Sequence, residues 1–214
     1  KQMKHRSAFY IAIILTLSCL SQCSAPPEEQ IQETFQAYKK AILKKDGETA
    51  YKQIDKNTRD YYALMLDHAM NLPAEKTREL TFVNQIIVLM ARHMIEQEQI
   101  RAMDGKAFFV YAVNQGWIDE RQVQGMEIEI QKVDGDKATT HIKRGEVTAP
   151  MGFDFRREDA GWRIDLTSVL EIAEQQFQGM IQRSQMDSRE LIYAILAELS
   201  GNQPTDSVWE PLNQ

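Results

Sequence analysis

The sequence has only two cysteines, Cys19 and Cys23, and both lie in its first 25 residues. The body of the chain has no thiol, so neither a disulfide nor a cysteine-type zinc site can stabilise it. Its fold must therefore depend on an apolar core. A composition that is 43% hydrophobic over 214 residues supplies enough apolar side chains to build one.

The sequence also lacks an apolar run of the roughly 20 residues that a membrane-spanning helix needs. Its longest run extends only from Ala8 to Leu20 and includes Thr16 and Ser18. Basic residues precede this run and a short segment ending in cysteine follows it, which is the order of a secretory signal. We therefore expect residues 1–22 to be an export signal.

The segment Leu20-Ser21-Gln22-Cys23 resembles the lipobox of bacterial lipoproteins, in which a leucine lies three residues before the modified cysteine. Gln22 departs from the pattern, which has a small residue at this position, and Cys19 is a weaker candidate. The resemblance implies a lipid on Cys23 and attachment to a bacterial membrane, facing the periplasm or the cell surface. Residues 23–29, which contain Pro26 and Pro27, are expected to form an extended tether.

The sequence has few basic residues for a nucleic-acid-binding protein. It has 25 Lys and Arg against 31 Asp and Glu, and a formal net charge of −6. Phosphates require a basic face, so we expect no nucleic acid partner. The acidic balance also provides no attraction to anionic lipid, so membrane contact would come from the lipid chains on Cys23.

Apolar side chains recur at helical spacing in the first half of the body. Ile31, Phe35, Tyr38 and Ile42, for example, lie four, three and four residues apart. This spacing predicts helices near residues 31–42, 50–54, 58–72, 77–103 and 108–115. Thr58 and Asp104 are expected to cap two of them.

From Gly125 the apolar period changes from about 3.6 to 2, which is typical of half-buried strands. Asp134-Gly135 is a hairpin turn signal. The alternating residues predict four strands, near residues 126–131, 138–142, 151–155 and 162–166, joined by short turns into an antiparallel meander.

Two capping patterns after the strands predict C-terminal helices. Ser168-x-x-Glu171 begins one and Asp187-x-x-Glu190 begins another, which Gly201 ends. Residues 202–214 have too few apolar side chains to fold alone and are predicted to be a flexible tail, although Val208 and Trp209 could dock back.

These elements predict an α+β fold, with N-terminal helices packed on a curved antiparallel meander of about four strands and followed by C-terminal helices. Two parts of the chain resemble the nuclear transport factor 2-like superfamily. The first is EEQIQETFQAYKKAILKKDGETAYKQID, and the second is VQGMEIEIQKVDGDKATTHIKRG together with MGFDFRREDAGWRIDL. The resemblance implies one cone-shaped domain over residues 30–201 with extra helices. The superfamily contains isomerase-like and dehydratase-like enzymes and many non-enzymes. Dimers through the outer sheet face are common in it, so a homodimer is compatible with this fold.

A pocket in such a cone would be lined by apolar residues of the inner sheet face. The candidates are Met126, Ile128, Phe153, Phe155 and Trp162. Asp154 and Asp165 alternate with these residues, so we expect both carboxylates to point outward. In the opposite register, one of them would be an acid in an apolar pocket with a raised pKa, as a catalyst requires.

The histidines do not form a recognisable site. His68 is expected at the boundary of the core and His141 in water. His93 and Glu96, three residues apart, are expected to form a solvated pair on one helix face. Zinc-hydrolase spacing, a nucleophile elbow and a phosphate-binding glycine loop are absent from the sequence.

We therefore expect no metal and no cofactor. The favoured function is a non-catalytic, lipid-anchored envelope module that binds a small apolar ligand or a protein partner. The alternative is a cone-fold enzyme that performs general acid–base chemistry with an acid that the sequence does not identify.

Overall fold

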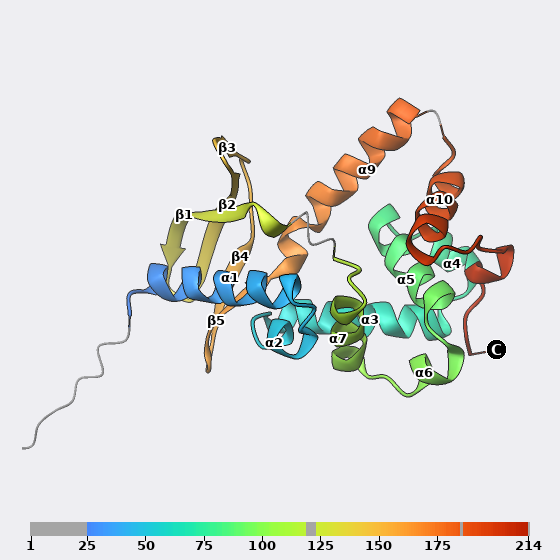
Figure 1. Cartoon of the computed structure of the whole chain (residues 1–214), viewed down its shortest axis with the longest axis horizontal. Helices are drawn as coiled ribbons and strands as arrows, with labels where there is room; N and C mark the ends of the chain where they lie inside the picture. Colours follow the sequence, from blue (N-terminus) through green and yellow to red (C-terminus); the bar gives the residue numbers. More distant parts are fainter. Residues whose placement is uncertain (1–24, 119–122, 185, 214) are drawn as a thin grey trace, which may run out of the picture.

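The computed structural model describes residues 25–118, 123–184 and 186–213 (Figure 1). The predicted signal (residues 1–22) and the predicted lipid site, Cys23, lie outside these residues. The predicted α+β class is confirmed. Helices precede and follow an antiparallel sheet, and the strands come in sequence order along it, as a meander requires.

Within residues 25–118, seven helices precede the sheet. They are α1 (Pro27–Leu43), α2 (Gly47–Tyr51), α3 (Lys56–Asn71), α4 (Ala74–Arg78), α5 (Phe82–Met94), α6 (Gln97–Arg101) and α7 (Gly105–Asn114). Helix α1 begins inside the segment that we predicted to be an extended tether. Pro27 occupies its first position, where a proline is tolerated, and Glu28 and Glu29 in its first turn complement the helix dipole.

The long helix predicted over residues 77–103 is wrong, because the chain breaks it into α4, α5 and α6. Thr81 accepts a hydrogen bond from the Asn84 N–H and so starts α5, while Ile95 is extended and ends it. Apolar periodicity continues across both breaks and hides them in the sequence. The predicted cap of α3 is also displaced, since Asp55 rather than Thr58 caps this helix and accepts from the Thr58 N–H.

The sheet consists of β1 (Met126–Asp134), β2 (Lys137–Arg144), β3 (Val147–Thr148), β4 (Asp154–Glu158) and β5 (Gly161–Asp165). Its order is β1-β2-β4-β5, and the two-residue strand β3, which we did not predict, pairs with β2. The Asp134-Gly135 turn forms as predicted, with Asp134 opposite Lys137. The chain at Ile54 forms a parallel bridge with Ile164, which brings the start of α3 beside β5.

After the sheet come the 3₁₀ helix η1 (Leu166–Val169), α9 (Leu170–Ser184), α10 (Ser188–Ser200) and the 3₁₀ helix η2 (Asp206–Trp209). The capping box at Asp187 and the end of α10 at Gly201 agree with prediction. Ser168 does not cap a helix, because η1 already includes it and Asp165 is the residue that caps η1.

The C-terminal segment is packed and is not the flexible tail that we predicted. Val208 and Trp209 are buried among the helices. The backbone N–H of Asn213 donates to Met70 O over 2.9 Å, which ties the segment to the end of α3. Side chains of distant helices supply the apolar contacts that the segment lacks in itself.

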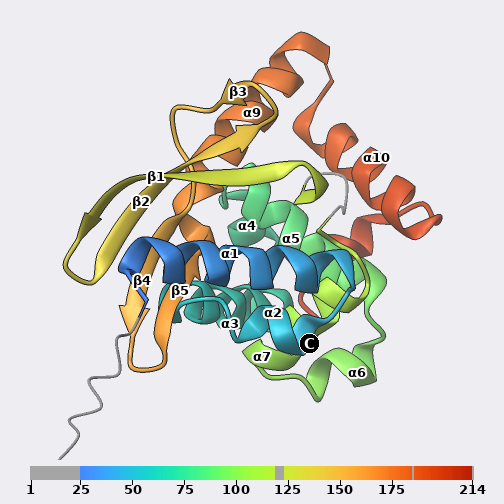
Figure 2. The ribbon, with the colours of Figure 1, turned by 60° about the vertical axis from the view of Figure 1, so that its left-hand side comes forward.

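The buried residues form three clusters. One fills the space between the sheet and α1, α2 and α7. The other two lie in a helical half of the molecule, around α5 with α10 and η2, and between α3, α5 and α7. In Figures 1 and 2 the sheet with α1 lies at one end of the molecule, and α4, α5, α10 and the C-terminal segment lie at the other.

Candidate functional site

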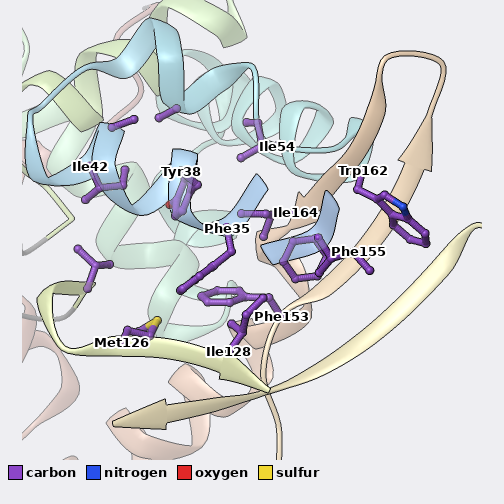
Figure 3. Packing of buried hydrophobic residues seen from close by; sticks show 14 of the residues in the cluster. Phe35, Tyr38, Ile42, Ile54, Met126, Ile128, Phe153, Phe155, Trp162 and Ile164 are labelled. Carbon is purple, nitrogen blue, oxygen red and sulfur yellow. The ribbon is translucent and has the colours of Figure 1, made fainter. Parts of the chain in front are cut away.

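The five residues predicted to line a pocket are part of a packed core (Figure 3). Met126, Ile128, Phe153, Phe155 and Trp162 are all buried, and Phe155 and Trp162 are 0% and 1% exposed. They share one cluster with residues of α1, namely Ile31, Phe35, Tyr38, Ala41 and Ile42. The ring centroids of Phe35 and Phe153 are 6.1 Å apart. Helix α1 therefore occupies the space that a ligand would need.

Polar side chains of α1 also cover part of the free edge of the sheet. Gln32 Nε2 donates to Ile128 O over 3.1 Å, and Lys39 Nζ donates to Met126 O over 2.8 Å. An exposed edge strand can pair with another chain, and satisfied carbonyls reduce that tendency. Farther along β1, a register shift between Ile130 and Lys132 interrupts the ladder.

A charged cluster lies where β4, β5 and the start of α3 meet. Arg156 Nε is 3.3 Å from Asp55 Oδ2 and 3.3 Å from Asp165 Oδ2. Asp55 is 0% and Asp165 3% exposed. Asp165 is thus buried, although we expected its carboxylate to point outward. Alternation places it on the face opposite to Ile164, but the beginning of α3 and η1 cover that part of the sheet.

The two buried aspartates have pKa values that move in opposite directions. Burial raises the pKa of Asp55, and the Asp165 carboxylate adds to the rise, against hydrogen bonds from Thr58 and the charge of Arg156. Burial would also raise the pKa of Asp165, but hydrogen bonds from Thr167, Asn57 and Arg156 hold it below its usual value. Two neighbouring carboxyls whose pKa values are displaced in opposite directions are a pattern found at acid–base sites.

Both aspartates also have structural roles. Asp55 Oδ1 caps α3 by accepting from Thr58 N, and Asp165 Oδ1 accepts from Thr167 N at the start of η1. Asp55 Oδ2 accepts no hydrogen bond within the described ranges. Asp154, expected to point outward, is half-buried at this cluster, and burial raises its pKa too.

A second buried charge, Arg92 of α5, was not identified from the sequence. Its Nε donates to Ala69 O over 2.9 Å, and its Nη2 to His68 O and Leu72 O over 2.8 and 2.6 Å. Its Nη1 donates to Trp209 O over 2.5 Å and lies 3.4 Å from Thr77 Oγ1. Burial lowers the pKa of Arg92 to about 10, against the charge of Glu210, so the side chain stays protonated at neutral pH.

All five N–H groups of Arg92 are therefore used inside the protein. Three of the acceptors are carbonyls at the C-terminal end of α3, where a cation is favoured by the helix dipole. Arg92 joins α3, α5 and the C-terminal segment, and it has no donor left for a ligand.

The histidines do not converge on these clusters. His93 lies at the end of α5, and its Nε2 is 2.9 Å from Ser200 Oγ. The predicted pair with Glu96 on one helix face is wrong, because α5 ends between the two residues and Glu96 lies at the N-cap position of α6. His141 of β2 is half-buried and lies opposite Glu129 of β1. His68 is half-buried, as expected for a residue at the boundary of the core.

Two hollows open on the surface. One, of about 670 Å³, lies between the end of α5, α6 and the C-terminal segment, and includes His93, Glu96, Arg101 and Glu210. The other, of about 510 Å³, lies between α3 and α7 and includes Lys56, Asp60 and Lys106. Neither hollow includes a predicted pocket residue or either buried aspartate. Their charged linings differ from the apolar linings that small-molecule sites usually have.

The most exposed large apolar side chains are on other parts of the surface. They are Leu64, Val147, Met151, Met186 and Leu199. Helix α9 adds a further apolar surface, since its apolar side chains from Leu170 to Ile181 are all only half-buried. Four of its exposed positions carry glutamine rather than charge, at residues 175, 176, 178 and 182.

Helix α9 is nevertheless firmly attached to α5. The Glu174 carboxylate accepts from Phe82 N and Val83 N over 3.1 and 3.0 Å, at the first turn of α5. Phe177 packs against Phe82, with ring centroids 5.2 Å apart. Burial would raise the pKa of Glu174, but hydrogen bonds from Gln178 and from the two N–H groups hold it below its usual value.

Over the described residues, no group of three or more His, Cys, Asp and Glu side chains is arranged to hold a metal ion. In the same part of the chain no helix is long and apolar enough to cross a membrane. Comparison of the chain with protein-family models, with curated proteins and with solved structures finds no match.

Proposed function

We propose that this chain is a lipid-anchored module of the bacterial cell envelope that binds a protein partner on its outer surface and performs no catalysis. The packed interior is the observation that carries the proposal. The residues that would line a pocket for a small apolar ligand instead contact α1, and burying them there stabilises the fold. Binding by this domain is thus best supported at its surface.

Helix α9 is the surface that best fits a protein partner. Half-exposed apolar side chains bordered by polar residues are typical of protein-binding surfaces. The exposed glutamines of α9 give this helix few charges, and charged residues are depleted at the centres of protein interfaces. The partner should accordingly offer an apolar, weakly charged surface.

The outer face of the sheet is a less suitable contact surface. Charged residues lie opposite one another across its strands, with Glu127 beside Lys143 and Arg156 beside Arg163. Removing such charges from water is costly unless a partner neutralises them. We therefore do not extend the proposal to a homodimer through this face.

Native mass spectrometry of the full-length protein, purified from membranes in mild detergent, tests the proposal. We expect a bound polypeptide that is lost in Ile172→Glu, a half-exposed position on α9 outside the buried clusters. It should be retained in Leu64→Glu, a matched control on α3 whose side chain is 48% exposed. A bound small apolar molecule in place of a polypeptide would contradict the proposal, as would loss of the partner in both variants.

The alternative, an acid–base enzyme, has one observation in its favour. Asp55 is a buried acid with a raised pKa, which is a property of catalytic carboxyls. However, it caps α3, contacts Arg156, and lies on neither hollow. Asn caps a helix as well as Asp does, so we expect Asp55→Asn to leave folding and partner binding intact. Loss of a cellular function in this variant, with the partner still bound, would favour the enzyme.

A further inference from the structure

The position of the lipid anchor decides which end of the domain faces the membrane. Helix α1 begins at Pro27, four residues after Cys23. An extended chain spans at most about 3.6 Å per residue, so these two Cα atoms can be no more than about 14 Å apart. This inference rests on the proposed function, because it requires the lipid on Cys23.

The direction of α1 identifies the part of the sheet that lies near its start. Gln32 contacts Ile128, while Lys39, farther along α1, contacts Met126. Helix α1 and β1 therefore run in opposite directions. The start of α1 lies toward the end of β1, where the turn to β2 is located (Figure 2).

The turn between β4 and β5 also lies on this side. Thr34, in the first half of α1, donates to Trp162 O over 3.2 Å, and Trp162 follows this turn directly. Both hairpin turns and the first turn of α1 thus form one end of the molecule.

The opposite end of the molecule is reached by following α3 away from the sheet. This helix begins beside β5, where Asp55 N donates to Ile164 O, and its 16 residues extend for about 24 Å. Its far end holds Arg92 of α5 through Ala69 O. The next residue, His93, contacts Ser200 at the end of α10, so Leu199 lies at the end of the molecule away from the hairpin turns.

We propose that the first turn of α1 and the two hairpin turns face the lipid surface, and that the helical half points away from it. Charge does not produce this contact. Exposed acidic residues are found in all three turns, at Glu28, Glu29, Asp134, Asp136 and Asp159, and they outnumber the exposed basic residues that flank the turns, Lys132, Lys137 and Arg157. They oppose adsorption to anionic lipid, so the short tether must hold this end at the membrane. Protein without the lipid should not bind anionic vesicles.

The absence of cysteine after Cys23 makes the orientation measurable. Single cysteines at Asp136→Cys, Ala160→Cys and Leu199→Cys, all at exposed positions, would each accept one fluorophore. The labelled full-length lipoprotein is reconstituted into phosphatidylcholine vesicles that contain a lipid with a nitroxide on its headgroup. We expect several-fold stronger quenching of the labels at positions 136 and 160 than of the label at 199.

Equal quenching at all three positions, or stronger quenching at position 199, would overturn the orientation. The mass of the mature N-terminal peptide, measured on the same samples, separates this failure from failure of the proposed function. If the peptide carries lipid on Cys23 but the quenching pattern differs from the expected one, only the orientation is contradicted. A peptide without lipid contradicts both.

Discussion

Arg92→Met removes the buried charge that joins α3, α5 and the C-terminal segment. Methionine fills much of the same volume but donates no hydrogen bond, so the buried carbonyls of His68, Ala69 and Trp209 lose their partner. Each hydrogen bond contributes about 0.5–1.5 kcal/mol net, and leaving a buried group unpaired costs about 1–3 kcal/mol. Some acceptors will regain water, so we expect a total loss of roughly 3–5 kcal/mol.

For a chain of this size, 1 kcal/mol corresponds to about 2–4 °C in Tm. The expected decrease for Arg92→Met is therefore roughly 6–20 °C in a thermal melt followed by circular dichroism. Arg92→Lys keeps the charge but offers only three donors, all from one nitrogen. Its Tm should therefore lie between the Tm of the wild type and the Tm of Arg92→Met.

The same variant should also release the C-terminal segment. Trp209 O loses its donor, so limited proteolysis near residues 202–213 should accelerate in Arg92→Met before the rest of the chain is cut. Lys132→Met is a suitable control, because Lys132 pairs with Asp134 at an exposed site on the β1–β2 hairpin, and such pairs contribute little to stability. A Tm of Arg92→Met equal to that of the control, with no new cleavage, would refute the reasoning.

Three further predictions concern Trp162 of the sheet and the carboxyls of Glu174 and Asp55. Trp162→Ala should cost about 3–5 kcal/mol in urea unfolding, as truncation of a fully buried aromatic does, and an unchanged midpoint would contradict the packing at β5. Glu174→Gln should cost about 1 kcal/mol at pH 7. Because the folded-state pKa of Glu174 is lowered, that difference should disappear as the pH falls through this pKa, and a difference independent of pH would argue against the cap. Asp55→Asn should equal or exceed the wild type in stability at pH 7, since the raised pKa of Asp55 makes its ionised form unfavourable in the fold. This gain should shrink as the pH falls through the folded-state pKa, and a large loss at pH 7 would show that the pair with Arg156 outweighs burial.

Most of the sheet was predictable because its pattern is local, although the strand predicted near residues 151–155 begins only at Asp154 and leaves Met151 exposed. Apolar residues alternate through Met126, Ile128, Phe153 and Phe155, and a one-residue slip would expose all of them, so the register follows from the sequence. Turn residues such as Gly135, whose φ is +60°, mark where the strands end. The capping box at Asp187 is local in the same way.

The breaks between α4, α5 and α6 were missed because an apolar stripe does not record where a helix stops and restarts. Ile95 is apolar and fits the helical spacing, yet its backbone is extended. The burial of residues 208–209 was left open, since it needs α5, more than a hundred residues earlier, as well as the nearby α10.

The sequence by itself determined the α+β class, the meander, most helix locations and an apolar interior, because propensity and periodicity act over a few neighbouring residues. Only the tertiary structure decided that α1 fills the space a ligand would need, and that the ionisable side chains of Arg92 and Asp55 are buried. Arg92 meets Trp209 across 117 positions in the chain, and Asn57 meets Asp165 across 108. Whether a charge is paired or buried depends on such distant partners, and no local pattern specifies them.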